Sequence, residues 1–182
     1  MRVLFAHGFE GGPSGSKPIF MRDVLGWDVT APVMSELGWD IEKQTEVLLR
    51  EIDESDYDLV IGSSMGGLAA ANASSLRGDS GFRLLLIAPA FGLSDSWEGL
   101  TGEELSEWRD EGTRRYRGFE LDIDLEWGFM EAAMRMSWPG QSTNDTCRTS
   151  SYVHLPCLTL SPVELPRVRK LPGRGHSGSM HL

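Results

Sequence analysis

The segment around Ser64 constrains the fold more than any other part of the chain. An apolar run at residues 57–61 leads into a Gly-Ser-Ser-Met-Gly pentapeptide at residues 62–66, and small residues follow at 68–73. This order predicts a buried strand, a sharp turn and a helix, with glycines where side chains would clash. Such a turn exposes a serine hydroxyl beyond the end of a sheet and points a helix N-terminus at it. We therefore predict a nucleophile elbow with Ser64 at its apex.

Three further apolar runs in the first 90 residues predict the rest of a sheet. We expect strands at residues 2–6, 27–30, 58–61 and 82–88, and helices at about 16–25, after Asp40 and after the elbow. Strands that alternate with helices indicate an α/β fold with a doubly wound, mostly parallel sheet. Ligands bind such a sheet at the carboxyl ends of its strands. His7, Ser64 and Pro89 follow three of the strands, so we expect them at one edge.

The pattern changes beyond residue 90. Residues 101–104 predict a capping box for a helix through Trp108, residues 119–125 alternate like an exposed strand, and residues 126–136 are helix-like. Four of the six tryptophans lie in this part of the chain: Trp97, Trp108, Trp127 and Trp138. They fit either a helical layer packed on the sheet or a cap that lines an apolar acyl pocket.

Composition limits the classes of partner. The 182 residues suit a single domain, and the net charge of -10 argues against nucleic acids and anionic membranes as partners. The apolar run at the N-terminus is too short for a secretory signal, and no run is long enough to span a bilayer. Cys147 and Cys157 form no C-x-x-C pair, which favours neither a disulfide nor a metal site. We expect a cytoplasmic protein, and the oligomeric state stays open.

The charge balance reverses near the C-terminus. Residues 1–139 carry 12 basic and 25 acidic residues, whereas residues 140–182 carry 5 basic and 2 acidic ones. The second stretch also contains both cysteines and three of the four histidines. Such a shift marks a linker, a tail or another module. We therefore predict a core at residues 1–138, including the layer or cap at 92–138, and an atypical segment at 139–182.

A serine hydroxyl needs a base and oxyanion donors before it becomes an effective nucleophile. The elbow itself supplies one donor, the backbone N–H of Met65. A second donor usually comes from the loop after an early strand, which makes the Phe9 N–H the candidate here. His7, in the same loop, is a candidate for the base, although a His-Gly pair at this position more often shapes the oxyanion loop.

Several linked motifs resemble the small YqiA-type α/β-hydrolase esterases. They occur in the family's order and spacing at residues 6–13, 16–17, 31–32, 62–67 and 88–90, and the resemblance covers residues 1–138. It implies an α/β-hydrolase fold, Ser64 as nucleophile, and Phe9 and Met65 as backbone oxyanion donors. It also implies hydrolysis of carboxylic esters or thioesters of acyl chains without a metal or organic cofactor.

The C-terminal segment departs from the family pattern. Members continue with a strand, a His-Gly-x-x-Asp loop, a helix and a strand that bears the base histidine. Here residues 152–160 form a plausible strand, followed by Glu164 as the candidate acid and His176 as the candidate base. His176 comes only twelve residues after Glu164, which is barely enough for a crossover. His154 precedes the acid, which is the wrong chain order for this fold. Either the hydrolase is shortened or inactive, or residues 140–182 are out of frame.

The expected function is that of a serine hydrolase for small acyl esters or thioesters. Ser64 attacks the carbonyl, His176 acts as base and then as acid, and Glu164 orients His176. Two alternatives stay open, namely a catalytically impaired binding protein on a hydrolase scaffold and an acyltransferase. Lys17 is either a contact for an anionic group of the substrate or an ordinary exposed lysine.

Overall fold

The computed structural model describes residues 1–78 and 81–137. Its main sheet has four parallel strands in the order β2-β1-β3-β4. The strands are β1 (Arg2–Ala6), β2 (Asp28–Thr30), β3 (Leu59–Ser63) and β4 (Arg83–Ile87). The predicted sheet is therefore confirmed, with strand ends that differ from the prediction by one or two residues.

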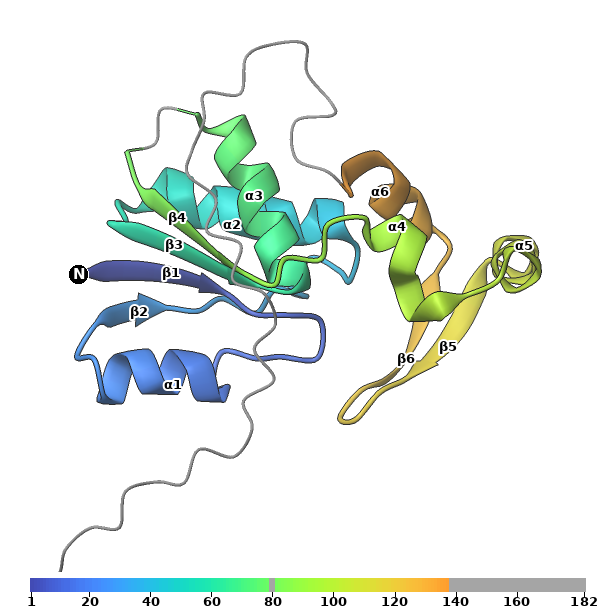
Figure 1. Ribbon diagram of the computed structural model, residues 1–182, viewed down its shortest axis with the longest axis horizontal. Helices are drawn as coiled ribbons and strands as arrows, with labels where there is room; N and C mark the ends of the chain where they lie inside the picture. The colour runs from blue at the N-terminus through green and yellow to red at the C-terminus, as the bar shows by residue number, and fades with distance from the viewer. Residues whose placement is uncertain (79–80, 138–182) are drawn as a thin grey trace, which may run out of the picture.

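Helices cover both faces of the sheet. Helix α1 (Ser16–Asp23) lies on one face, and α2 (Ile41–Glu54) and α3 (Met65–Leu76) lie together on the other, as Figure 1 shows. This is the doubly wound arrangement that right-handed crossovers between parallel strands produce. The predicted fold class is confirmed.

The two helices on the shared face are formed for different local reasons. Asp40 begins α2, because its side chain accepts a hydrogen bond from the Lys43 N–H at 2.9 Å. Ile41 and Leu48 are then fully buried on the inner side of this amphipathic helix. In α3 the first nine residues are all buried, and most of them are glycine or alanine. Their small size allows α3 to lie in the middle of the core, directly against the sheet.

A second region lies beyond the carboxyl ends of the strands (Figure 1). We call residues 93–136 the cap region. It consists of α4 (Leu93–Ser96), a short 3₁₀ turn at Trp97–Gly99, α5 (Gly102–Glu111), the antiparallel hairpin β5 (Thr113–Arg117) and β6 (Asp122–Glu126), and α6 (Gly128–Met136). Arg135 of α6 forms an ion pair with Glu42 of α2 at 2.8 Å, which is one contact between the cap region and the sheet region.

The predicted capping box is confirmed. The Thr101 hydroxyl accepts a hydrogen bond from the Glu104 N–H, and the Glu104 carboxylate accepts one from the Thr101 N–H at 2.8 Å. The helix runs three residues beyond the predicted end at Trp108. It stops at Gly112, which has a φ of 77° and closes the helix in the left-handed conformation.

The exposed strand predicted at residues 119–125 is confirmed in part, because the strand found there begins three residues later and ends one residue later than predicted. The structure has a hairpin, in which β6 starts at Asp122 and pairs with β5, a strand that the sequence reading missed. Strand β5 reads Thr-Arg-Arg-Tyr-Arg and has no apolar alternation. Charge pairs across the hairpin stabilise it instead, since Arg115 lies opposite Asp124 and the two side chains are 3.2 Å apart. Phe119 lies in the connecting turn and is 92% exposed. Helix α6 begins two residues later than predicted.

None of the helices within the described ranges is long and apolar enough to cross a membrane.

Candidate functional site

Ser64 occupies a strained turn between β3 and α3. Its φ of 55° and ψ of -124° lie in a region that residues with side chains rarely adopt. Backbone hydrogen bonds hold it there: the Ser64 N–H donates to the Ile87 carbonyl at 3.0 Å, and the Ser64 carbonyl accepts from Gly67 at 2.9 Å and Ala90 at 3.0 Å. The predicted strand, sharp turn and helix are present, and neighbouring β4 helps to lock the turn.

The glycines of the pentapeptide are required by close packing. A Cβ atom on Gly66 would overlap the carbonyl oxygens of Ala6 and His7, because the first turn of α3 lies against the end of β1. A Cβ atom on Gly62 would lie 2.5 Å from the Gly66 carbonyl oxygen and 2.8 Å from the Ala70 Cβ. These contacts bring the loop after β1 next to Ser64.

The loop after β1 lies directly against the serine. A Cβ atom on Gly8 would be 3.1 Å from the Ser64 Cβ and 3.6 Å from its Oγ. No residue that the structure describes accepts a hydrogen bond from the backbone N–H of Phe9 or of Met65. Within the described part of the chain both predicted oxyanion donors are therefore unpaired, one in the loop that lies against Ser64 and the other on the residue that follows it. Their catalytic role stays a prediction.

His7 is engaged by the backbone on both ring nitrogens. Nδ1 lies 2.9 Å from the Gly8 carbonyl oxygen, and Nε2 accepts a hydrogen bond from the Met34 N–H at 3.4 Å. This pattern fits the neutral ring protonated at Nδ1. Burial lowers the pKa of His7 below its ordinary value, which also favours the neutral form. The geometry fits a histidine that shapes the loop rather than one that takes a proton from Ser64.

A cavity of about 500 Å³ opens beside Ser64. The sheet region contributes Ser63, Ser64, Lys17 and the loop at 8–11, and the cap region contributes Leu93, Ser96, Trp97, Glu98 and Tyr116. Besides glycine, Ser64, Ala88 and Glu98 are the described residues with a positive φ, and two of them line this cavity. Strained backbone of this kind concentrates at functional sites.

The tryptophans divide between the two expected roles. Trp97 lines the cavity, as an acyl pocket would require, and its ring lies 5.0 Å from that of Phe9. Trp108 is only 2% exposed, and its Nε1 donates to the Leu125 carbonyl at 3.0 Å. Trp127 packs against Trp108 with ring centroids 5.7 Å apart. The cap region thus contributes an aromatic wall to the cavity, and its buried residues, Trp108 among them, join the core that also contains sheet-region residues.

Three charged residues line the cavity. The Glu10 carboxylate accepts hydrogen bonds from the Phe119 N–H at 2.8 Å and the Tyr116 hydroxyl at 3.2 Å. Burial and the neighbouring Glu10 carboxylate raise the pKa of Tyr116 above its ordinary value, so the hydroxyl stays protonated and donates. Glu98 forms an ion pair with Arg114 at 3.7 Å. Lys17 is exposed and forms no ion pair with the residues described.

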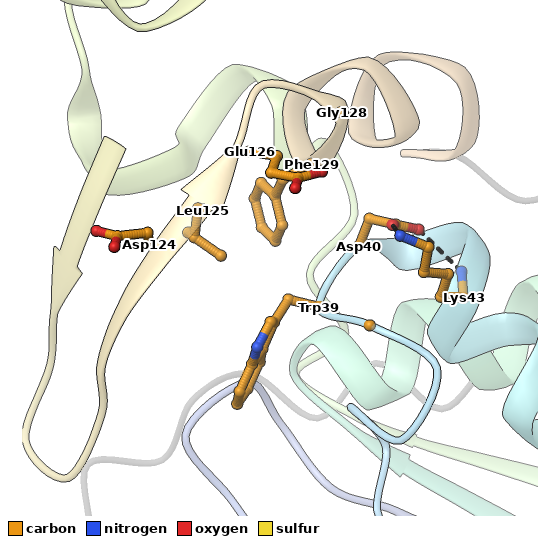
Figure 2. Close-up of a pocket in the computed structure, with 9 residues that line it drawn as sticks. Trp39, Asp40, Lys43, Asp124, Leu125, Glu126, Gly128 and Phe129 are labelled. Atoms are coloured by element: carbon orange, nitrogen blue, oxygen red, sulfur yellow. Dashed lines mark hydrogen bonds and ion pairs between the residues drawn. The ribbon is translucent and has the colours of Figure 1, made fainter. Parts of the chain in front are cut away.

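A smaller cavity of about 220 Å³ lies between the start of α2 and the cap region. Figure 2 shows Trp39 and Phe129 beside it, with the Lys43 ammonium 2.9 Å from the Asp40 carboxylate. That carboxylate raises the pKa of Lys43. The lining of this smaller cavity includes no predicted site residue and no serine, cysteine or histidine. Within the described ranges no group of three or more histidine, cysteine, aspartate or glutamate side chains could hold a metal ion.

The structure brings Ser64 together with Phe9 and Met65, but it does not test the rest of the predicted site. Glu164, His176 and His154 lie outside the described residues, as does the whole predicted segment at 139–182. The hypothesis of an altered reading frame concerns that segment and is therefore not tested. The sequence reading missed Glu10 and Tyr116 as lining residues. Glu10 lies inside the His-Gly-Phe-Glu motif. Its partner Tyr116 is 106 residues further along the chain, so no local sequence pattern indicates the contact between them.

Several solved structures have a similar fold, and two of the three compared below are described as hydrolases. A presumed hydrolase from Agrobacterium vitis S4 has a TM-score of 0.59 at 21% identity, with 75% of this chain and 60% of that chain covered. The α/β hydrolase domain-containing protein 10 from mouse has a TM-score of 0.59 at 19% identity, with 74% and 61% covered. Est1E from Butyrivibrio proteoclasticus has a TM-score of 0.57 at 17% identity, with 73% and 58% covered.

At these identities the similarity shows a shared α/β-hydrolase fold, and the chain spans only about 60% of each of these proteins. No curated protein matches the chain significantly. A family model does match, over residues 2–123, which is more than half of the chain. This match and the confirmed motifs agree with the resemblance to the YqiA-type hydrolases. The chain therefore belongs to the uncharacterised protein family UPF0227 and has an α/β-hydrolase fold.

Proposed function

We propose that the protein is a serine hydrolase that cleaves carboxylic esters or thioesters of small acyl groups, with Ser64 as nucleophile. One observation supports this most directly. Ser64 has a strained, positive-φ backbone at the carboxyl edge of the sheet and beside a cavity, and no described residue accepts a hydrogen bond from the N–H of Met65 or of Phe9 in the adjoining loop. A turn of this kind is the arrangement in which α/β-hydrolases present their nucleophile.

The proposed reaction has two steps. The Ser64 Oγ attacks the acyl carbonyl carbon while its proton passes to a base, for which His176 is the candidate, oriented by Glu164. The N–H groups of Phe9 and Met65 stabilise the negative charge on the carbonyl oxygen. The protonated base then gives its proton to the departing alcohol or thiol, which leaves an acyl-serine. Water, deprotonated by the same base, hydrolyses this acyl-serine and restores Ser64.

The cavity supports an apolar acyl group. Its volume of about 500 Å³ is in the range of small-molecule sites, and Phe9, Trp97 and Tyr116 supply an aromatic wall next to Ser64. Aromatic side chains bury apolar groups at a low cost in conformational entropy. Lys17 is at the same cavity and is the proposed contact for an anionic group on the leaving side of the substrate.

A fluorophosphonate probe on the full 182-residue chain tests the proposal. We expect one probe per chain, attached to Ser64, and no labelling of Ser64→Ala. Ser63→Ala is the matched control, because Ser63 lines the same cavity one residue away, and it should still be labelled. Labelling that persists in Ser64→Ala would contradict the assignment of the nucleophile. A folded wild-type chain that is not labelled would instead favour a binding protein on a hydrolase scaffold.

A further inference from the structure

The loop that carries Phe9 is fastened to the cap region by the next residue, Glu10. The Glu10 carboxylate accepts hydrogen bonds from the Phe119 N–H at 2.8 Å and from the Tyr116 hydroxyl at 3.2 Å. The contact is made by the backbone N–H of Phe119 and not by its ring, and this residue is 92% exposed. A carboxylate bridge therefore joins the loop after β1 to the β5–β6 hairpin.

The hairpin is shaped to receive this carboxylate. A Cβ atom on Gly118 would overlap Glu10 Oε1 and lie 2.8 Å from the Tyr116 ring. The Gly118 N–H donates to the Leu121 carbonyl at 2.8 Å, which closes the hairpin turn just beyond the contact. Glycine thus allows the turn to approach Glu10 directly.

The ring of Phe9 reinforces the same connection. It packs edge to face against Trp97 at 5.0 Å, Tyr116 at 5.1 Å and Phe129 at 5.7 Å, all in the cap region. Trp39, from the sheet region, adds a fourth edge contact at 5.3 Å. Two consecutive loop residues, Phe9 and Glu10, therefore contact the cap region through their side chains, while the preceding residue of the same loop, Gly8, lies against Ser64.

We propose that Glu10 is a positioning residue for ester hydrolysis, because it ties the loop carrying the Phe9 N–H to the β5–β6 hairpin. This inference rests on the proposed function. An oxyanion donor works only when it is held at the position that the oxygen takes in the transition state, and small displacements are costly. The hairpin then has two roles at once: Tyr116 forms the cavity wall and also holds Glu10.

Two substitutions of Glu10 separate positioning from charge. Glu10→Ala removes both acceptors, and we expect kcat to fall about 10- to 100-fold with KM within about 3-fold, since a displaced oxyanion donor affects the transition state most. Glu10→Gln keeps an acceptor for the Phe119 N–H and should retain kcat within about 3-fold of wild type. Asp122→Ala is the matched control, because it removes a hairpin carboxylate that pairs with Arg115 and does not contact the loop.

A third variant reaches the contact from the other side. Gly118→Ala keeps the Glu10 carboxylate but places a methyl group on it, so the carboxylate must move. We expect a fall in kcat in the same direction as in Glu10→Ala. This variant also tests the inference if Glu10→Ala fails to fold, and thermal unfolding of each variant detects that case.

The experiment measures kcat and KM for a p-nitrophenyl ester of a short acyl chain, with the full-length protein and all four variants. Loss of kcat in Glu10→Ala and Gly118→Ala, with Glu10→Gln and Asp122→Ala near wild type, supports the positioning role. Wild-type kcat in Glu10→Ala would overturn it and leave the proposed function intact. An equal loss in Glu10→Gln would also overturn it, because charge and not position would then matter. A wild-type chain without Ser64-dependent hydrolysis would overturn both proposals.

Discussion

In the sheet region Ser64 is held by backbone groups, whereas in the cap region the cavity wall is held by side chains. Ser64 makes its hydrogen bonds to Ile87, Gly67 and Ala90 through main-chain atoms, and the first nine residues of α3 are buried behind it. Tyr116, by contrast, is held through its hydroxyl and its ring. The nucleophile therefore depends on packing that tolerates little change, while the cavity wall depends on a few contacts that single substitutions can alter.

Charge is used differently in the two regions as well. The β5–β6 hairpin is stabilised by exposed ion pairs such as Arg115 with Asp122 at 2.6 Å and with Asp124 at 3.2 Å. Exposed pairs of this kind contribute little to stability, because solvent screens the two charges. The two central strands of the sheet, β1 and β3, are instead mainly apolar and buried, as is usual in parallel sheets. Five substitutions, two of them followed across pH, test this comparison from the largest expected effect to the smallest.

Gly66→Ala should be the most damaging of these changes. Its methyl group would overlap the carbonyl oxygens of Ala6 and His7, and neither backbone can move without shifting β1. We expect a loss of about 5 kcal/mol or more in the free energy of unfolding, measured by denaturant titration. Gly12→Ala is the control, because nothing lies within 4 Å of the added Cβ atom. Equal stability of the two variants would show that the elbow is not tightly packed.

Trp108→Ala should destabilise the cap region. The indole is 2% exposed and donates to the Leu125 carbonyl at 3.0 Å, so its removal leaves a cavity and an unpaired acceptor. The expected cost is about 3–5 kcal/mol, again from denaturant titration. If the two regions respond separately, intrinsic fluorescence of the cap tryptophans should be lost at a lower denaturant concentration than the helical circular dichroism. A single coincident transition would show that the two regions unfold as one unit.

Trp97→Ala should change the cavity more than the fold. Its ring is half-buried and lines the cavity against Phe9 and Phe129, with centroids 5.0 and 4.5 Å away. We expect KM for longer acyl esters to rise about 10-fold, in line with the loss of an aromatic contact, while a two-carbon acyl ester is affected less. The measurement is KM across a series of p-nitrophenyl esters. Equal losses across the series would place Trp97 in the scaffold instead of the acyl site.

The two regions should lose stability in different pH windows. The folded pKa of His7 lies below its ordinary value of about 6.5, because burial penalises the charged ring. Below that pH the unfolded chain binds more protons, so stability falls with decreasing pH from about 6.5 down to the folded pKa. His7→Gln should flatten this part of the profile. A slope that persists in the variant would assign the effect to another group.

The smallest effect should come from Glu104 in the capping box. Hydrogen bonds from the Thr101 backbone and hydroxyl lower the pKa of Glu104 in the folded chain. Its contribution is therefore present above the ordinary glutamate pKa of about 4.3 and is lost as the pH falls through the folded pKa. Glu104→Gln should flatten only this acidic window, as followed by thermal unfolding between pH 3 and 5. No difference from wild type would show that the capping box adds nothing measurable.

Local signals in the sequence located the elbow and the sheet with an accuracy of one or two residues. The strand before Ser64 is a continuous apolar run. Gly62 lies where β3 packs against α3, and Gly66 lies where α3 meets the end of β1. Asp40 and Thr101 carry cap chemistry within three residues of their partners. Features of this kind depend on neighbours in the chain, so periodicity and cap residues are sufficient to predict them.

The hairpin and the wall of the cavity could not be located in the same way. Strand β5 has no apolar alternation, and its pairing with β6 depends on opposite charges across the two strands. The contact between Glu10 and Tyr116 joins residues that are 106 positions apart. No spacing rule connects such residues, because only the packing of the cap region against the carboxyl edge of the sheet brings them together.

The sequence by itself determined the parallel sheet, the elbow with Ser64 at its apex, and the family to which the chain belongs. The sheet and the elbow follow from hydrophobic burial and backbone sterics, which act over a few residues. The family follows from linked motifs that can be read along the chain. Only the tertiary structure decided that His7 is engaged through both ring nitrogens, that Trp97 and Tyr116 wall the cavity, and that Glu10 connects the loop to the hairpin. The physical reason is that these are contacts between distant segments, whose partners are chosen by packing and not by local conformation.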